Sequence, residues 1–127
     1  MAPPSPRSPA FTGRELDVMA ALWRLGPSTV AEVRAAISDP LAYTTVLTVL
    51  RTLDAKGLVG HKAAARAHRF HARVTREVAA AAALRQVVDR LFDGSAVDCA
   101  TALAALPGVT AGDVKRIRKR LKRLQKA

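Results

Sequence analysis

One segment, residues 41–72, constrains the fold of this 127-residue chain more than any other part. The spacing of its apolar residues predicts a helix over residues 42–55. An α-helix rotates by about 100° per residue, and this rotation gathers the apolar residues of the segment on one side, with Tyr43 and Leu47 at the edge of that side. The apolar side comprises Ala42, Val46, Val49, Leu50 and Leu53. The opposite side carries Thr44, Thr45, Thr48, Arg51, Thr52 and Ala55. Gly57 is suited to end the helix.

Two short strands are predicted after this helix, over residues 58–62 and 67–72, with a basic connecting tip over residues 63–66. Side chains alternate between the two faces of a strand, so Arg69 and His71 share one face of the second strand and His68 and Phe70 share the other. The connection lacks a two-residue glycine turn, which favours a looser hairpin than the tightest ones.

Two further helices are predicted before this segment. Each opens with capping-box spacing, at Thr12-Gly-Arg-Glu15 and at Thr29-Val-Ala-Glu32. In the first helix an apolar face is expected from Leu16, Met19, Ala20 and Trp23. Together these elements predict a mainly α fold. A winged helix-turn-helix domain of three helices and a short β-wing is expected over residues 11–73, preceded by a disordered arm over the proline-rich residues 1–10.

Composition narrows the class of partner. The formal net charge is +11, and the stretch from Asp113 to the end holds 8 basic residues and 1 acidic residue. Such a balance favours a polyanion, with nucleic acid ahead of membrane. A single cysteine, Cys99, excludes an intrachain disulfide and fits a reducing cytoplasm. It is expected to be a buried small side chain, with a redox switch as the alternative.

Three absences from the sequence limit its function further. No apolar run approaches the roughly 20 residues needed to span a bilayer. No catalytic constellation or phosphate-cradling glycine loop stands out, so the chain is not expected to be an enzyme. His68 and His71 point to opposite faces of a strand, which argues against shared metal ligation. We therefore expect neither a metal nor another cofactor.

The threonine-rich face is suited to DNA, because a helix fits the major groove and hydroxyl and methyl groups can contact base edges there. Thr44, Thr45 and Thr48 are the candidates for base contacts. The helix and the wing also carry cations that are candidates for contacts with the DNA backbone: Arg51, Lys62, Arg66 and Arg69. The alternative is that the threonines form an ordinary solvated helix surface.

Four sequence blocks resemble the BlaI/MecI/CopY, or penicillinase repressor, family. They are TGRELDVMAALW (12–23), STVAEV (28–33), LAYTTVLTVLRTLDAKGLV (41–59) and RAHRFHA (66–72). A weaker resemblance continues over residues 74–95. This resemblance implies a dimeric transcriptional repressor with Thr44, Thr45 and Thr48 at base-facing positions, Arg51 at the DNA backbone, Arg66 in the wing and Arg69 as its neighbour.

Residues 74–127 are predicted to be helical, with helices over 75–92, 95–106 and from Thr110 onward. The resemblance assigns dimerisation to this region, with an intramolecular core as the alternative. The apolar candidates for the dimer contact are Val88, Leu91, Phe92, Leu103, Leu106, Ile117 and Leu121. The last helix is strongly basic where relatives tend to be acidic. It is either a solvated face around an apolar seam, a source of extra phosphate contacts, or a docking site for an acidic partner.

Two departures from the family concern the signal that ends repression. Antibiotic-resistance members are cut by a membrane-bound protease at an Asn-Phe bond, but this sequence contains no Asn. Copper-responsive members carry a C-terminal cysteine cluster, which a chain with one cysteine cannot form. The candidate partner for release is therefore a sensor protease that cuts another bond, or another inducing factor.

The leading hypothesis is a cytoplasmic, nucleoid-associated bacterial repressor that binds palindromic operators in double-stranded DNA as a homodimer. It is not expected to bind a membrane. The first alternative is a basic architectural protein that coats or bridges DNA with little sequence preference. The second is a protein-interaction module whose basic tail binds an acidic partner.

Overall fold

The computed structural model describes residues 11–64 and 67–126. The predicted arm over residues 1–10 and the wing candidate Arg66 lie outside the described residues. The chain divides into two compact units, Met1–Leu84 and Arg85–Ala127. Its elements, in order, are α1 (Gly13–Leu25), α2 (Val30–Ala36), α3 (Tyr43–Ala55), β1 (Val59–Ala64), β2 (Ala67–Ala72), α4 (Arg76–Leu91), α5 (Ala96–Ala104) and α6 (Ala111–Gln125).

Local capping explains where several helices begin. The Thr12 hydroxyl accepts from the Glu15 amide while the Glu15 carboxylate accepts from the Thr12 amide, and Thr29 with Glu32 repeats the arrangement at α2. Both capping boxes are those expected from the sequence. In the second unit Thr110 caps α6 in the same way.

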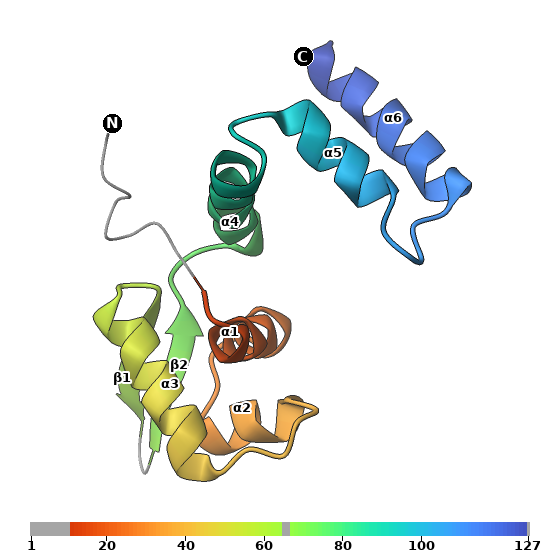
Figure 1. Cartoon of the computed structure of the whole chain (residues 1–127). Coiled ribbons are helices and arrows are strands. Elements are labelled where there is room, and N and C mark those ends of the chain that lie inside the picture. Colours follow the sequence, from red (N-terminus) through yellow and green to blue (C-terminus); the bar gives the residue numbers. More distant parts are fainter. Residues whose placement is uncertain (1–10, 65–66, 127) are drawn as a thin grey trace. The chain divides into compact units, whose positions relative to one another are not determined.

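The first unit is built from α1, α2 and α3 with the two-stranded wing beside α3 (Figure 1). Its buried core is aliphatic and has one aromatic member: Val18, Met19, Ala21, Leu22, Val30, Val33, Leu41, Val46, Leu50, Leu53, Leu58, Val59 and Phe70. The indole N–H of Trp23 donates to the Val74 carbonyl at 2.9 Å and so ties α1 to the chain beyond the wing.

The prediction for the apolar face of α1 was partly wrong. Met19 is buried and Trp23 is half-buried, but Leu16 and Ala20 are exposed. The buried stripe instead runs through Glu15, Val18, Met19 and Leu22. A glutamate therefore occupies one position of the buried stripe, which an apolar pattern does not reveal.

The wing is longer than predicted. Antiparallel pairing runs from Val59 with Ala72 to Ala64 with Ala67, so only two residues connect the paired ends. Backbone pairing continues through Ala63 and Ala64, which the sequence assigned to the tip. The expected looser connection concerns residues 65 and 66, which lie outside the described residues. Ser28 adds a bridge at the other edge of β2, exchanging backbone hydrogen bonds with Phe70 at 2.9 and 2.7 Å.

The second unit buries little of its own apolar surface. Neither α5 nor α6 has a buried residue. Among the described residues of this unit, only Val88, near the end of α4, is buried. Cys99 is half-buried, and its thiol is free. Across residues 11–64 and 67–126, no helix is both long and apolar enough to cross a bilayer.

Candidate nucleic-acid interface

Helix α3 is held at its start by the chain that precedes it rather than by its own cap. Its N-cap residue, Ala42, makes no side-chain hydrogen bond. Leu41 is buried in the core, and its carbonyl accepts from the Arg34 guanidinium at 2.6 Å. Core packing and a hydrogen bond from α2 therefore set the position at which α3 begins.

The end of α3 turns directly into the wing. Gly57 has a φ of 80°, and its amide donates to the Asp54 carbonyl at 2.9 Å. The Leu58 amide donates to the Leu53 carbonyl at 3.0 Å. These two bonds form a Schellman motif, in which the left-handed position favours glycine. Helix α3 and strand β1 are thus joined by a hydrogen-bonded turn.

The two sides of α3 differ as the sequence predicts, except at Ala42, which is exposed because it is the N-cap, and at Val49, which is only half-buried. Val46, Leu50 and Leu53 are fully buried and anchor the helix against the core. The exposed side brings together all the candidate contacts that the sequence placed on this helix: Thr44, Thr45, Thr48 and Arg51. Thr52 is exposed beside them. The helix therefore presents a continuous hydroxyl-bearing surface, which we call the threonine face.

Internal hydrogen bonds determine what the threonine face offers. The Thr48 hydroxyl donates to the Thr44 carbonyl at 2.8 Å, and the Thr52 hydroxyl donates to the Thr48 carbonyl at 3.0 Å. A hydroxyl whose proton is used in this way still has acceptor lone pairs. In this conformation Thr48 can accept from a base amino group or pack its methyl against thymine.

The wing places Lys62 and Arg69 directly opposite each other, and both are exposed. The Arg69 guanidinium is already engaged: it donates to the Pro27 carbonyl at 3.2 Å and pairs with the Glu32 carboxylate at 3.4 Å. The Thr29 amide at α2 holds the pKa of Glu32 below its usual range, which favours this pair. Arg69 thus braces the wing against α2, while Lys62 forms no ion pair within the described chain.

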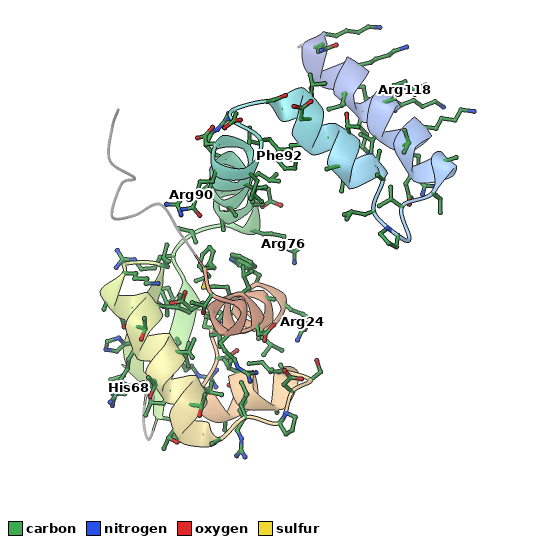
Figure 2. All side chains as sticks on the ribbon, in the orientation of Figure 1. Arg24, His68, Arg76, Arg90, Phe92 and Arg118 are labelled. Carbon is green, nitrogen blue, oxygen red and sulfur yellow. The ribbon has the colours of Figure 1, made fainter. Side chains whose placement is uncertain are left out.

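The other face of the wing carries His61, His68 and Phe70 and turns toward α3. The His61 ring lies against the Asp54 carboxylate of α3 and stacks on His68, with ring centroids 5.2 Å apart. His68 is labelled in Figure 2, beside α3. The alternation of side chains along the strand predicted that His68 and Phe70 share a face. Because Phe70 is apolar, this shared face could have been expected to turn toward the core.

A groove runs between α3 and this face of the wing. Its lining includes Arg51, Tyr43, Asp54 and both histidines. Tyr43 is 48% exposed, more than its expected place at the edge of the apolar side implied. Lys62 and Arg69 lie on the opposite face of the wing, so the structure does not bring them together with Arg51 as one cluster. The sequence had not placed His61 in this groove.

The candidates for dimer contact divide into exposed and covered residues. Val88 is buried, and Phe92 is half-buried, within this single chain. The others remain exposed by 37–74%: Leu91, Leu103, Leu106, Ile117 and Leu121. Within residues 11–64 and 67–126, no group of three His, Cys, Asp or Glu side chains could hold a metal ion.

The model of the penicillinase repressor family matches residues 11–123 of the chain. In fold, the chain is similar to a MarR family protein from Bacillus stearothermophilus, at 18% identity and a TM-score of 0.50, covering 93% of this chain and 75% of that one. It is also similar to MepR, a transcription regulator of the Staphylococcus aureus multidrug efflux pump MepA, at 16% identity and a TM-score of 0.50, covering 92% and 79%. The predicted winged-helix fold class is thereby confirmed. No curated protein matches the chain.

Proposed function

The chain belongs to the penicillinase repressor family and is a DNA-binding transcriptional repressor, and from that premise we propose how it binds its operators. The threonine face of α3 enters the major groove and reads base edges. Two copies of the chain bind the two halves of a palindromic operator in double-stranded DNA. The role is regulatory and not catalytic, and its place is the bacterial cytoplasm, at the nucleoid.

The observation that carries this proposal is the two-sided character of α3. Fully buried Val46, Leu50 and Leu53 fix the helix, so Thr44, Thr45 and Thr48 project from a rigid support. Short side chains let the helix backbone approach the base pairs closely. We propose that Thr44, Thr45 and Thr48 make the base contacts.

Cations around this face are proposed to hold the DNA backbone. Arg51 lies on α3 beside the groove, and Lys62 extends from the outer face of the wing. Contacts of this kind supply affinity and orientation but little direct sequence information. Arg69 is proposed to contact a phosphate while it braces the wing, and Arg66 is proposed as a wing contact on the family resemblance alone.

A second copy of the chain is the proposed cover for the apolar surface of the second unit. Leu91, Leu103, Leu106, Ile117 and Leu121 are all exposed, and neither α5 nor α6 has a buried residue. Burying them between two copies would remove their apolar surface from water and give a two-fold complex. Val88, which is buried, and Phe92, which is half-buried, are proposed to support this surface from within the chain.

A sensor protease or another inducing factor is proposed as the partner that releases the chain from DNA. The absence of Asn from the sequence excludes cleavage at an Asn-Phe bond. Proteolytic release would therefore use another bond.

Footprinting on the chain's own promoter region, combined with sedimentation of the complex, tests this proposal. The expected result is two protected half-sites related by a dyad and separated by about 34 Å or a multiple of it, with two chains bound per operator. Uniform protection that spreads with concentration would instead support a basic architectural protein with little sequence preference.

A further inference from the structure

Helix α6 concentrates positive charge that the chain itself does not neutralise. Eight Lys and Arg residues lie between Lys115 and Lys126, and all eight are exposed. Asp113 is the one acidic residue of the helix. Its carboxylate accepts from the Thr110 amide at 3.0 Å and from Arg116 at 2.5 Å, and the Thr110 amide holds the pKa of Asp113 below its usual range. Of the eight cations, Arg116 alone forms an ion pair within the described chain.

The cations surround most of the helix. At about 100° per residue, the apolar seam of Val114, Ile117, Leu121 and Leu124 covers only about 80° of the circumference. The basic residues cover about 200° of it, and we call this surface the cationic face. It consists of Lys115, Arg116, Arg118, Lys119, Arg120, Lys122, Arg123 and Lys126. Figure 2 shows Arg118 among long side chains that extend from α6 away from α5.

This arrangement is unfavourable without an external counter-charge. Lys115 with Lys119, Arg116 with Arg120 and Arg118 with Lys122 are like charges four residues apart, a spacing at which they repel. The favourable effect of cations on the helix dipole is confined to the last turn and does not account for those in the middle. The partner that matches such a face is itself densely charged.

The spacing of charge suits a densely charged duplex. At a rise of about 1.5 Å per residue, the cationic face presents roughly one positive charge per 2 Å of helix axis. Double-stranded DNA presents one negative charge per about 1.7 Å of its axis. The two densities are of the same order, although the cations spread over about 200° of the helix and only part of them can face one duplex.

A membrane surface fits this helix less well. Interfacial helices bury a broad apolar face and commonly carry Trp or Phe. The seam of α6 is narrow and contains no aromatic residue, and Ile117 already lines a hollow with Leu103 and Val109. DNA is also the polyanion that the first unit of the same chain binds.

We propose that the cationic face of α6 binds the phosphate backbone of double-stranded DNA without reading its sequence. This inference rests on the proposed function, because it adds a second DNA contact to the operator-binding unit. It raises the affinity for operator and for unrelated duplex by the same factor. It also makes binding by the full chain more dependent on salt than the contacts of α3 and the wing alone.

The test compares the full chain with two quadruple variants at Lys115, Lys119, Lys122 and Lys126. In the first, all four lysines become glutamine, which retains helix propensity and relieves repulsion. In the second, all four become arginine, which retains the charge. Affinity is measured between 50 and 200 mM salt, on the footprinted operator and on a random duplex of equal length.

The glutamine variant is expected to lose affinity for both duplexes by the same factor. Its slope of log affinity against log salt should become shallower by one unit or more, since each phosphate contact contributes about 0.9. The arginine variant should behave as the wild type. A control variant on α4, Arg76→Gln with Arg90→Gln, removes two charges outside α6 and should leave the slope within about half a unit of the wild type.

A slope change of less than one unit in the glutamine variant would overturn the inference, even if binding to vesicles of anionic lipid were lost. A loss confined to the operator would also overturn it, since that pattern indicates weakened dimerisation. Neither result would contradict the proposed function, because that function is tested by whether the wild type binds operator more tightly than random duplex. If the wild type shows no such preference, the proposed function fails by itself.

Discussion

The Lys56 ammonium, just past the end of α3, lies 2.9 Å from a carboxylate oxygen of Glu15, which is buried in α1. The other oxygen of that carboxylate accepts from the Thr12 amide at 2.9 Å. A single side chain therefore closes the capping box of α1 and holds the C-terminal end of the recognition helix. This contact joins α1 to the C-terminal end of α3, the helix that carries the threonine face.

Replacing Glu15 with Gln tests that link through the pH dependence of stability. Burial opposes ionisation, but hydrogen bonds from Lys56 and Thr12 outweigh it, so the pKa of Glu15 lies below its usual value of 4.5. A lowered pKa means that the stabilisation is complete above about pH 4.5 and is lost as the pH falls further. Glu15→Gln should lower the free energy of unfolding at pH 7 by about 1–2 kcal/mol, because half-exposed Lys56 keeps part of its hydration.

Denaturant unfolding from pH 7 to pH 3 measures this effect. The difference between wild type and Glu15→Gln should shrink as the pH drops below 4.5. Asp17→Asn, which changes an exposed carboxylate in the same helix, serves as the control. A difference between wild type and Glu15→Gln that stays constant over the whole range would contradict the assigned role of the Glu15 charge.

Phe70 is expected to be the main support of the wing. It is 4% exposed, belongs to the core and exchanges backbone hydrogen bonds with Ser28. Phe70→Ala should cost about 3–5 kcal/mol of unfolding free energy, since it empties a buried aromatic position. His68→Ala on the same strand is exposed and should cost less than about 1 kcal/mol. Equal costs for the two variants in denaturant unfolding would show that Phe70 is not a core residue.

The apolar seam of α6 gives a direct test of dimerisation. Leu121→Glu places a charge on a surface that the proposed dimer buries, so the dimer dissociation constant should rise at least tenfold. Leu25→Glu changes an equally exposed leucine on α1 and should leave that constant unchanged. Sedimentation velocity over a range of concentrations measures both. A Leu121→Glu protein that remains dimeric at wild-type concentrations would rule out the seam as the interface.

Thr48→Val separates the hydroxyl of Thr48 from its methyl group. Valine retains the shape and one methyl but removes the lone pairs that accept from a base. If Thr48 reads an amino group, Thr48→Val should weaken operator binding about as much as Thr48→Ala does, by roughly tenfold or more. If Thr48 instead packs against thymine, valine should restore binding. Fluorescence anisotropy with operator DNA distinguishes these contacts, and equal binding by all three proteins would exclude Thr48 as a base contact.

Local signals in the sequence predicted most of the first unit. Thr12 with Glu15 and Thr29 with Glu32 lie close in the chain, so the capping boxes that open α1 and α2 were readable from spacing. The two sides of α3 follow from the positions of its apolar residues, of which Val46 is typical. These features depend on residues within a few positions of one another.

Features that depend on distant partners were not predictable in the same way. Buried Glu15 is paired with Lys56, which is 41 positions away, so spacing within α1 did not reveal that Glu15 rather than Leu16 lies in the buried stripe. Strand register and tertiary packing determine two further contacts, the backbone bridge between Ser28 and Phe70 and the side-chain contact between His61 and Asp54. No periodic pattern within one element carries that information.

The most direct test of sequence reading by α3 is the operator preference of the double variant Thr44→Ala with Thr48→Ala. At physiological salt the wild type should bind its operator about 10³-fold or more tightly than random duplex. The double variant should lose most of that ratio while binding random duplex as the wild type does, because the phosphate contacts remain. An unchanged ratio in the double variant would contradict the assignment of base reading to the threonine face.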